Sequence, residues 1–480
     1  MTKLPPLREL HFGELDASQE AARSPELLTK GYFDFRNAAY AISSQGTWLL
    51  LGPKGAGKSA VLEYLKLSWQ GRYDRFFKYW ELDSFPVVDV AKLDPSGQSG
   101  QRAQPAWEML LLLKLLESFA EDEGATKSSD FTVLVQELGK SGLLTQDLAR
   151  VVTSLASSTW TIDLKLFKWS GEQRSKDTSI TDIVHDIRKV LEGFSTESQH
   201  LLALDGLDTF FFEGGTGWES LSGLIDALAA VNNFLLSLKL PASVVMTLRS
   251  DHFDALNSQN SNKLKDRTVF LDWAGGGIGA QNSLWQIVTR KAAVARPEVS
   301  DLVRQYLSLP VQKPEFPSVA EYLLSYTRLL PRDIVALMRH VQHASPGSSP
   351  VTSDAAKAAA KEYSEQYFIG ELMNNLSGVL LSSEAHKVAD FRDAIRSAPT
   401  RYFSFKYMTE ELNGVLTPEQ VRALLRRMFE TGGLAVSNKA TSGKRYTDFT
   451  FRRVSGGAFS TRYDYMLHDA LTRAWNRPWF

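Results

Sequence analysis

One eight-residue segment limits the folds open to this chain more than any other. Residues Gly52 to Ser59 read GPKGAGKS, follow the apolar run Thr47 to Leu51, and precede a helical pattern over Ser59 to Trp69. A strand, a glycine-rich turn and a helix in this order form the phosphate-binding loop of P-loop NTPases. The glycines let backbone N–H groups turn toward a phosphate, and the helix adds the positive end of its dipole. The segment therefore predicts a nucleotide-binding α/β fold.

Each part of this segment has an expected role. Lys58 is expected to bridge the β- and γ-phosphates, and the hydroxyl of Ser59 to bind magnesium. ATP with Mg²⁺ is the expected ligand, and a glycine-rich turn without a ligand is the alternative. The predicted nucleotide-contacting residues are Gly52, Pro53, Lys54, Gly55, Ala56, Gly57, Lys58, Ser59 and Ala60.

A second carboxylate is needed to help hold magnesium, and it should follow a buried strand. The apolar run Leu201 to Leu204 ends in Asp205, which we expect at the carboxyl edge of a parallel sheet as a magnesium ligand. Asp208 follows three residues later and is the candidate to orient or deprotonate the attacking water. A turn or helix cap is the alternative role for Asp208.

Two arginines are candidates to bind the γ-phosphate. Arg249 ends the apolar run Val244 to Leu248, so it should lie on the same sheet edge as Asp205. The planar guanidinium group can bind phosphate oxygens in pairs. An ion pair with Asp251 or Asp254 is the alternative for Arg249. Arg332 follows Pro331 at the start of a helix, and its alternative is a solvated charge paired with a neighbouring acid.

The remaining composition excludes several classes of protein. The chain has 480 residues, a formal net charge of −1 and no cysteine, which excludes disulfides, thiolate metal sites and a cysteine nucleophile. Met1 to Leu10 lacks the apolar core of a signal peptide. Apolar stretches such as Met109 to Leu113 are too short to span a bilayer. We expect a cytoplasmic protein without a membrane partner.

Strands that alternate with helices predict a parallel P-loop NTPase sheet flanked by helices. A helical lid and a C-terminal winged-helix domain are expected to follow it. The expected boundaries are 1–45 for an N-terminal segment that packs on the core, 46–275 for the core with an insertion at about 96–179, 276–345 for the lid, 351–390 for a helical connector and 391–480 for the winged helix.

The motifs GPKGAGKSA, LLALDGLD, VVMTLRSD and LLPRDI together resemble the STAND class of P-loop ATPases, relatives of the AAA+ proteins. FGELDA at residues 12–17 and RTVFLDW at 267–273 resemble a poorly characterised bacterial family of this kind. The resemblance implies an ATP-hydrolysing switch, often used in signalling or in defence against phage, that forms homo-oligomers and acts on a separate effector. STAND proteins often carry an acid after the second aspartate, where this chain has Thr209. Hydrolysis is then either slow or dependent on Asp208 alone.

The C-terminal portion is locally basic. Residues 401–480 contain 13 lysines and arginines against seven acidic residues. Two helices, Tyr407 to Leu412 and Glu419 to Glu430, and two strands, Gly433 to Ser437 and Tyr446 to Arg453, indicate a winged helix. An origin-recognition-like ATPase that binds DNA is the alternative function, and a protein-interaction module is the alternative use of the domain. The expected DNA contacts are Lys439, Lys444, Arg445, Arg452 and Arg453.

Overall fold

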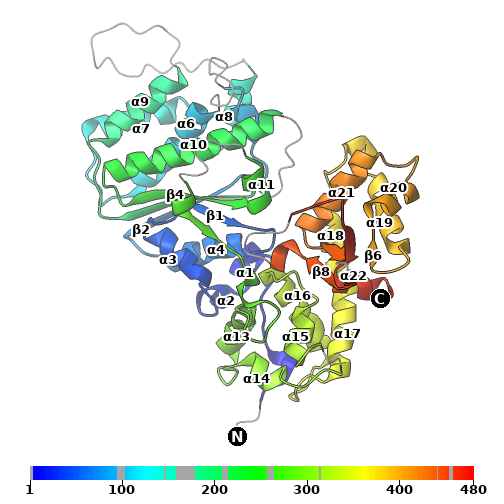
Figure 1. The fold of residues 1–480 in the computed structure, drawn as a ribbon. Coiled ribbons are helices and arrows are strands. Elements are labelled where there is room, and N and C mark those ends of the chain that lie inside the picture. The colour runs from blue at the N-terminus through cyan, green and yellow to red at the C-terminus, as the bar shows by residue number, and fades with distance from the viewer. Residues whose placement is uncertain are drawn as a thin grey trace. The chain divides into compact units, whose positions relative to one another are not determined.

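The computed structural model describes residues 4–93, 103–144, 147–157, 179–207, 215–256, 264–312, 315–439, 442–452 and 458–479. The chain folds into two compact units, coloured along the sequence in Figure 1. Unit 1 comprises Met1–Phe35, Gly55–Ala60 and Asp272–Phe480, and unit 2 comprises Arg36–Lys54 and Val61–Leu271. The phosphate-loop segment therefore contributes its first three residues to unit 2 and the rest to unit 1.

Unit 2 is built on a five-stranded parallel sheet, as predicted. Its strand order is β2-β3-β4-β1-β5. β3 and β4 are buried along almost their whole length, as expected for strands with helices on both faces. The strands are β1 (Leu49–Gly52), β2 (Arg75–Glu81), β3 (Gln199–Asp205), β4 (Ala242–Arg249) and β5 (Thr268–Phe270).

Helices cover both faces of this sheet (Figure 1). One face carries α6 (Gln104–Glu121), α9 (Ile180–Leu191) and α10 (Gly215–Ser237), and the other carries α3 (Ala38–Ser43) and α4 (Lys58–Trp69). On the first side, α7 (Ser129–Lys140) packs against α9, and α8 (Leu148–Ala156) packs against α5 (Val87–Val90). A short helix, α11 (Ser250–Ala255), follows β4.

Among the described residues, one helical segment, Gly217–Ser237 in α10, has the length and hydropathy of a membrane span. It packs against α6 and β4, which accounts for its apolar composition. The segment expected as an insertion at about 96–179 contributes α6, which is buried in the same core as β4. The start of this segment is thus part of the core. Apolar and polar residues alternate from Trp160 to Leu166, which predicts a half-buried strand, but these residues lie outside the described part of the chain.

The N-terminal region consists of short helices. The sequence pattern over residues 26–46 is that of one continuous helix, but this prediction was wrong, because the chain forms α1 (Ala17–Arg23), α2 (Pro25–Thr29) and α3 with a break before α3. Arg36 and Asn37 have φ angles of 56° and 54° at this break, which a continuous helix cannot accommodate. Residues 1–45, expected to pack together on the core, are divided between the two units.

Unit 1 contains the helical region that was expected as a lid and connector. Leu7, Leu10 and Phe12 are buried in one hydrophobic cluster with these helices. A π-helical turn, η6 (Ser364–Phe368), interrupts a long helix. The helices are α13 (Leu284–Ala295), α14 (Leu302–Tyr306), α15 (Val319–Leu324), α16 (Pro331–Ala344), α17 (Ser353–Tyr363) and α18 (Ile369–Asn374).

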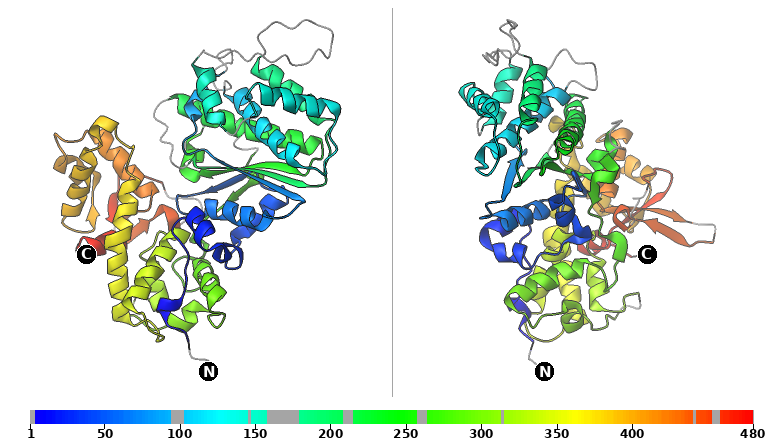
Figure 2. Two further views of the ribbon diagram at one scale, coloured as in Figure 1. Left: turned by 180° about the vertical axis from the view of Figure 1, so that it is seen from behind. Right: turned by 90° about the vertical axis from the view of Figure 1, so that its left-hand side faces the viewer.

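The C-terminal part of unit 1 combines short helices with an antiparallel sheet in the order β6-β9-β7-β8. The sequence predicted two strands here and missed β6 and β9, which have two and four residues. The β7–β8 hairpin extends from this sheet (Figure 2, right). The elements are α19 (Lys387–Ser397), β6 (Tyr402–Phe403), α20 (Phe405–Glu411), α21 (Pro418–Glu430), β7 (Leu434–Lys439), β8 (Arg445–Asp448), β9 (Asp464–Leu467) and α22 (Asp469–Ala474).

Candidate functional site

The phosphate-loop segment connects β1, which ends at Gly52, to α4, which begins at Lys58. Gly55 and Gly57 have φ angles of 87° and 94°, in the left-handed region that favours glycine. Such turns direct successive N–H groups into an anion-binding concavity. The predicted strand, turn and helix are therefore confirmed, and nucleotide contact by residues 52–60 stays a prediction.

Within unit 1, the first turn of α16 packs on this loop. A Cβ atom added to Gly55 would lie 3.4 Å from Cβ of Arg332, and one added to Gly57 would lie 3.7 Å from Cγ of Pro331. Nε1 of Trp273 donates a hydrogen bond of 3.0 Å to the carbonyl oxygen of Ala56. Side chains distant in sequence thus hold the loop from Gly55 onward.

Within unit 2, two predicted site residues lie at the carboxyl edge of the parallel sheet. β4 lies between β1 and β3, and Gly52 of β1 is in register with Arg249 of β4. Leu204 is in register with Met246, so Asp205 lies one position further along, level with Thr247. The prediction that Arg249 and Asp205 share this edge is confirmed. Their roles toward a ligand stay predictions.

Asp205 is held by two neighbouring strands. The hydroxyl of Tyr79 on β2 donates to Oδ2 of Asp205 at 2.7 Å, and the hydroxyl of Thr247 on β4 donates to its Oδ1. Burial and the nearby Asp205 carboxylate raise the pKa of Tyr79, which keeps its hydroxyl protonated as a donor. Asp205 itself is only 7% exposed. These bonds fix the orientation of the carboxylate, and sequence reasoning missed both donors.

Arg249 forms the ion pair that the sequence left open as its alternative role. Its Nε and a terminal nitrogen lie 2.9 and 2.6 Å from the two carboxylate oxygens of Asp251. The Arg249 side chain is 6% exposed and that of Asp251 is 23% exposed, so this bidentate pair is largely buried. A role of Arg249 toward the γ-phosphate stays a prediction, because this pair uses only Nε and one of the two terminal nitrogens.

Arg332 lies at the start of α16, with its Cβ beside the phosphate loop. Its Nε donates to the carbonyl oxygen of Leu15 at 3.0 Å, and its terminal nitrogen lies 3.7 Å from Oε2 of Glu371 on α18. The Arg332 and Glu371 side chains are 28% and 22% exposed. The charged group of Arg332 faces an acid of the connector, and a role of Arg332 toward the γ-phosphate stays a prediction.

Sequence reasoning also missed an aromatic pair beside the loop. The rings of Phe35 and Trp273 stack with centroids 3.8 Å apart and planes 14° apart. Trp273 is the residue that bonds the Ala56 carbonyl, so this pair is attached directly to the loop. The one signal in the sequence was the position of Trp273 at the end of the motif RTVFLDW. Asp208 and Thr209 lie outside the described residues.

The available donors fit magnesium bound together with a phosphate. In the part of the chain that the structure describes, no group of three or more histidine, aspartate or glutamate side chains is arranged to hold a metal ion. Mg²⁺ at nucleotide sites is commonly held by one or two protein groups plus substrate phosphates. Ser59 and Asp205 offer a hydroxyl and a carboxylate, which are hard oxygen ligands of the required kind.

Most of the basic residues that were expected to contact DNA are exposed, and several of them also contact aromatic or acidic side chains. Lys439, Lys444 and Arg452 are exposed, and the Lys444 ammonium lies 5.3 Å from the centre of the Tyr446 ring. Arg445 lies 3.0 Å from Asp464 and 4.3 Å from the centre of the Tyr402 ring. Arg452 stacks on Phe449 at 4.6 Å. Of the five predicted DNA contacts, three are exposed, Arg445 is half-buried, and Arg453 lies outside the described residues.

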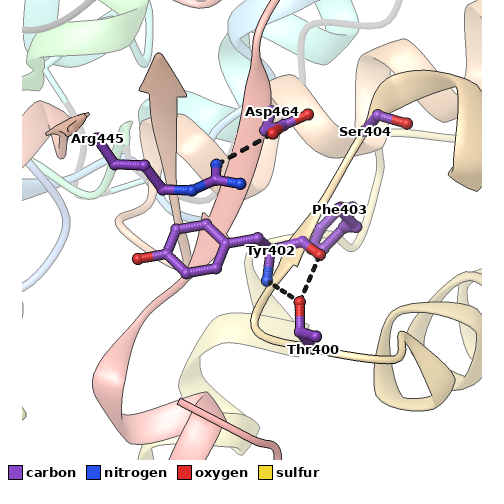
Figure 3. A pocket seen from close by; sticks show the side chains of 6 residues that line it. All are labelled: Thr400, Tyr402, Phe403, Ser404, Arg445 and Asp464. Carbon is purple, nitrogen blue, oxygen red and sulfur yellow. Dashed lines mark hydrogen bonds and ion pairs between the residues drawn. The ribbon is translucent and has the colours of Figure 1, made fainter. Parts of the chain in front are cut away.

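Arg445 also lines a pocket on the four-stranded sheet (Figure 3). The Thr400 hydroxyl accepts from the backbone N–H of Tyr402 at 3.1 Å and donates to its carbonyl oxygen at 3.0 Å. The Arg445 guanidinium lies along the Tyr402 ring and reaches Asp464. These contacts orient the pocket wall. Its lining residues are Thr400, Tyr402, Phe403, Ser404, Arg445 and Asp464.

Comparison with known proteins adds little to these observations. No model of a known protein family matches the chain. No curated protein sequence matches it either. Among solved structures, fifteen chains match, one of which is the crystal structure of Cdc6p from Pyrobaculum aerophilum. That match covers 94% of this chain and 98% of the other at 10% sequence identity, with a TM-score of 0.32.

Proposed function

We propose that this protein is an ATP-dependent molecular switch that binds Mg²⁺-ATP at its phosphate loop and hydrolyses it. The observation that carries the proposal is the loop itself. GPKGAGKS connects a parallel strand to a helix, and Gly55 and Gly57 adopt the left-handed conformations that an anion-binding turn requires. Lys58 is then the residue expected to bind the β- and γ-phosphates.

Two further observations support a triphosphate as the ligand. Asp205 ends a buried strand at the carboxyl edge of the sheet, which is where ligands bind in such folds. Its oxygens are oriented by Tyr79 and Thr247. A carboxylate that is held this rigidly suits a metal ligand, because a preorganised site loses little entropy on binding.

The proposal that the protein is a switch rests on the position of α16. Its first turn contacts the phosphate loop at Gly55 and Gly57, so the presence of a γ-phosphate acts directly on Arg332 and on the helix that carries it. We propose that this contact sets the position of the lid. The resemblance to STAND ATPases extends the proposal to homo-oligomers, a separate effector protein and a role in bacterial defence.

The rate of ATP hydrolysis depends on the segment that follows Asp205. Asp208 is the proposed group that activates water, and Thr209 stands where related ATPases often have an acid. We therefore propose slow hydrolysis. The test is phosphate release measured over hours for the wild type and for Asp208→Ala. Equal rates in the two proteins would contradict a catalytic role for Asp208, and a wild type that releases no phosphate would contradict hydrolysis.

The switch is tested by the mass of the particle in solution. We expect a non-hydrolysable ATP analogue to change the oligomeric state, and ADP to leave it unchanged. Light scattering after size exclusion measures both. The same mass with the analogue, with ADP and without nucleotide would contradict a switch that acts through assembly.

DNA binding is the second candidate function, favoured by the order of elements in the C-terminal part. One helix, a short strand, two helices and the antiparallel β7–β8 hairpin are followed by β9, which lies between β6 and β7 in the sheet, and this order of elements resembles that of a winged helix. Arg422 and Arg426 lie one turn apart on α21 and are both exposed. Such a pair can neutralise DNA phosphates.

A charge-matched pair of variants separates this function from the first. Arg422→Ala/Arg426→Ala removes two charges from α21, and Arg392→Ala/Arg396→Ala removes two from α19. If DNA is the partner, duplex DNA stimulates ATP hydrolysis, salt weakens the effect steeply, and only the α21 variant loses it. Equal rates with and without DNA would exclude this second function.

A further inference from the structure

A carboxylate of the connector faces the arginine that is expected to bind the γ-phosphate. Arg332 directs its guanidinium group toward Glu371 on α18, with 3.7 Å between the terminal nitrogen and Oε2. The Cβ of the same residue lies beside Gly55 of the phosphate loop. One guanidinium group thus lies between two anionic partners, one within the chain and one expected on the ligand.

The residue next to Arg332 is held in place by several hydrogen bonds. Asp333 is fully buried and accepts three hydrogen bonds from Arg328, at 2.9 Å from the backbone N–H and at 2.9 and 2.6 Å from the guanidinium group. The Tyr367 hydroxyl donates a fourth at 3.2 Å. The start of α16 is therefore anchored to the π-helical turn that precedes α18.

α18 also contacts the C-terminal part of the unit on its other side. A Cβ atom added to Gly433, at the start of β7, would lie 2.5 Å from the Leu372 side chain, so this helix lies directly against the sheet. Phe368 stacks on His468 at 4.7 Å, and Nε2 of His468 lies 3.2 Å from the Thr327 carbonyl. These contacts connect the segment that carries Glu371 with β7 and with His468, the residue that caps α22.

We infer that Glu371 is a regulatory residue that binds Arg332 in place of the γ-phosphate and so couples nucleotide state to the C-terminal domain. The inference rests on the proposed function. When a γ-phosphate takes over Arg332, the ion pair with Glu371 breaks and the contact between the lid and α18 weakens. ADP has no γ-phosphate and leaves the ion pair intact. Glu371 therefore lowers the affinity for ATP and not for ADP.

The test compares nucleotide affinities of Glu371→Gln, which keeps the size of the side chain and removes its charge. A partly exposed ion pair contributes about 0.2–1 kcal/mol, which corresponds to a change in affinity of up to about fivefold. We expect Glu371→Gln to bind ATP about two- to fivefold more tightly than the wild type does. ADP affinity should stay the same.

Two controls assign the effect to the ion pair. Glu365→Gln removes the same charge from the π-helical turn, where Glu365 lies 3.9 Å from Lys361 and is 44% exposed, and should change neither affinity. In an Arg332→Ala background, Glu371→Gln should have no effect on ATP. Hydrogen exchange in α18 and β7 should rise on ATP binding in the wild type and be raised without nucleotide in Glu371→Gln.

The outcomes distinguish this inference from the function on which it rests. Tighter binding of both nucleotides, an effect that persists without Arg332, or no effect at all would overturn the role of Glu371, even where ATP binding depends on Lys58. A wild type that binds ATP no better than Lys58→Ala does would overturn the proposed function and this inference together.

Discussion

The Arg328–Asp333 pair allows the sharpest prediction about stability. Asp333 is 0% exposed and Arg328 is 4% exposed, and the two side chains are joined by two hydrogen bonds of 2.9 and 2.6 Å. The amide of Asp333→Asn would present N–H donors to a guanidinium group that can only donate. Removal of one partner of a buried pair costs about 3–5 kcal/mol, because the other charge stays buried without compensation. We expect a loss of this size in the free energy of unfolding of unit 1.

Urea unfolding followed by circular dichroism measures the loss, and hydrogen exchange in α16 assigns it to unit 1. Asp354→Asn is the matched control, because the Asp354 side chain is 93% exposed and lies 3.5 Å from Lys357. We expect it to cost less than about 0.5 kcal/mol. Replacement of both buried partners, as Arg328→Met/Asp333→Leu, should recover more than half of the loss. A cost below about 1 kcal/mol for Asp333→Asn would refute the reasoning.

Two further predictions concern the phosphate loop and the buried His468. Gly57→Ala places a side chain on a residue with a φ of 94°, which costs about 1–2 kcal/mol. Gly71→Ala is the control, because Gly71 has a similar φ of 78° and lies outside the loop. In an ATP titration, Gly57→Ala should bind ATP more weakly than Gly71→Ala does. Burial, and then the nearby charge of Arg452, lower the pKa of His468 in the folded protein. In the unfolded chain the pKa of a histidine is about 6.5. Above that pH His468 does not lower the free energy of unfolding, and below it His468 lowers this free energy by up to about 1.4 kcal/mol per pH unit. The free energy of unfolding, measured at pH 7 and pH 5, should therefore change less with pH in His468→Gln than in the wild type. The same change with pH in both proteins would contradict this account.

The sheet and the loop were predictable from local patterns. The apolar runs before Gly52, Asp205 and Arg249 are each bounded by polar or glycine residues, and a buried parallel strand requires a continuous apolar run of this kind. The common edge of Asp205 and Arg249 then follows from the direction of the strands alone. No tertiary contact was needed for that inference.

The partners of the site residues could not be predicted in the same way, because they come from distant parts of the chain. Tyr79 reaches Asp205 from β2, and Glu371 reaches Arg332 from α18. In the motif LLPRDI, the sequence pattern indicated Arg332 as the site residue, whereas the fully buried charged residue is the adjacent Asp333. Arg445, one of the expected DNA contacts, pairs with Asp464 of β9, which the sequence did not indicate as its partner. β6 is too short, at two residues, to show a strand pattern.

The central claim is that the loop from Gly52 to Ser59 binds the phosphates of ATP through Lys58. Titration calorimetry of the wild type, Lys58→Ala and Lys66→Ala with Mg²⁺-ATP tests it most directly. Lys66 lies on the same helix, is 49% exposed and pairs with Glu63 at 3.2 Å, so it is the matched control. We predict that Lys58→Ala retains its circular dichroism spectrum and loses measurable ATP binding, while Lys66→Ala binds as the wild type does. Equal ATP affinity in all three proteins would contradict the claim.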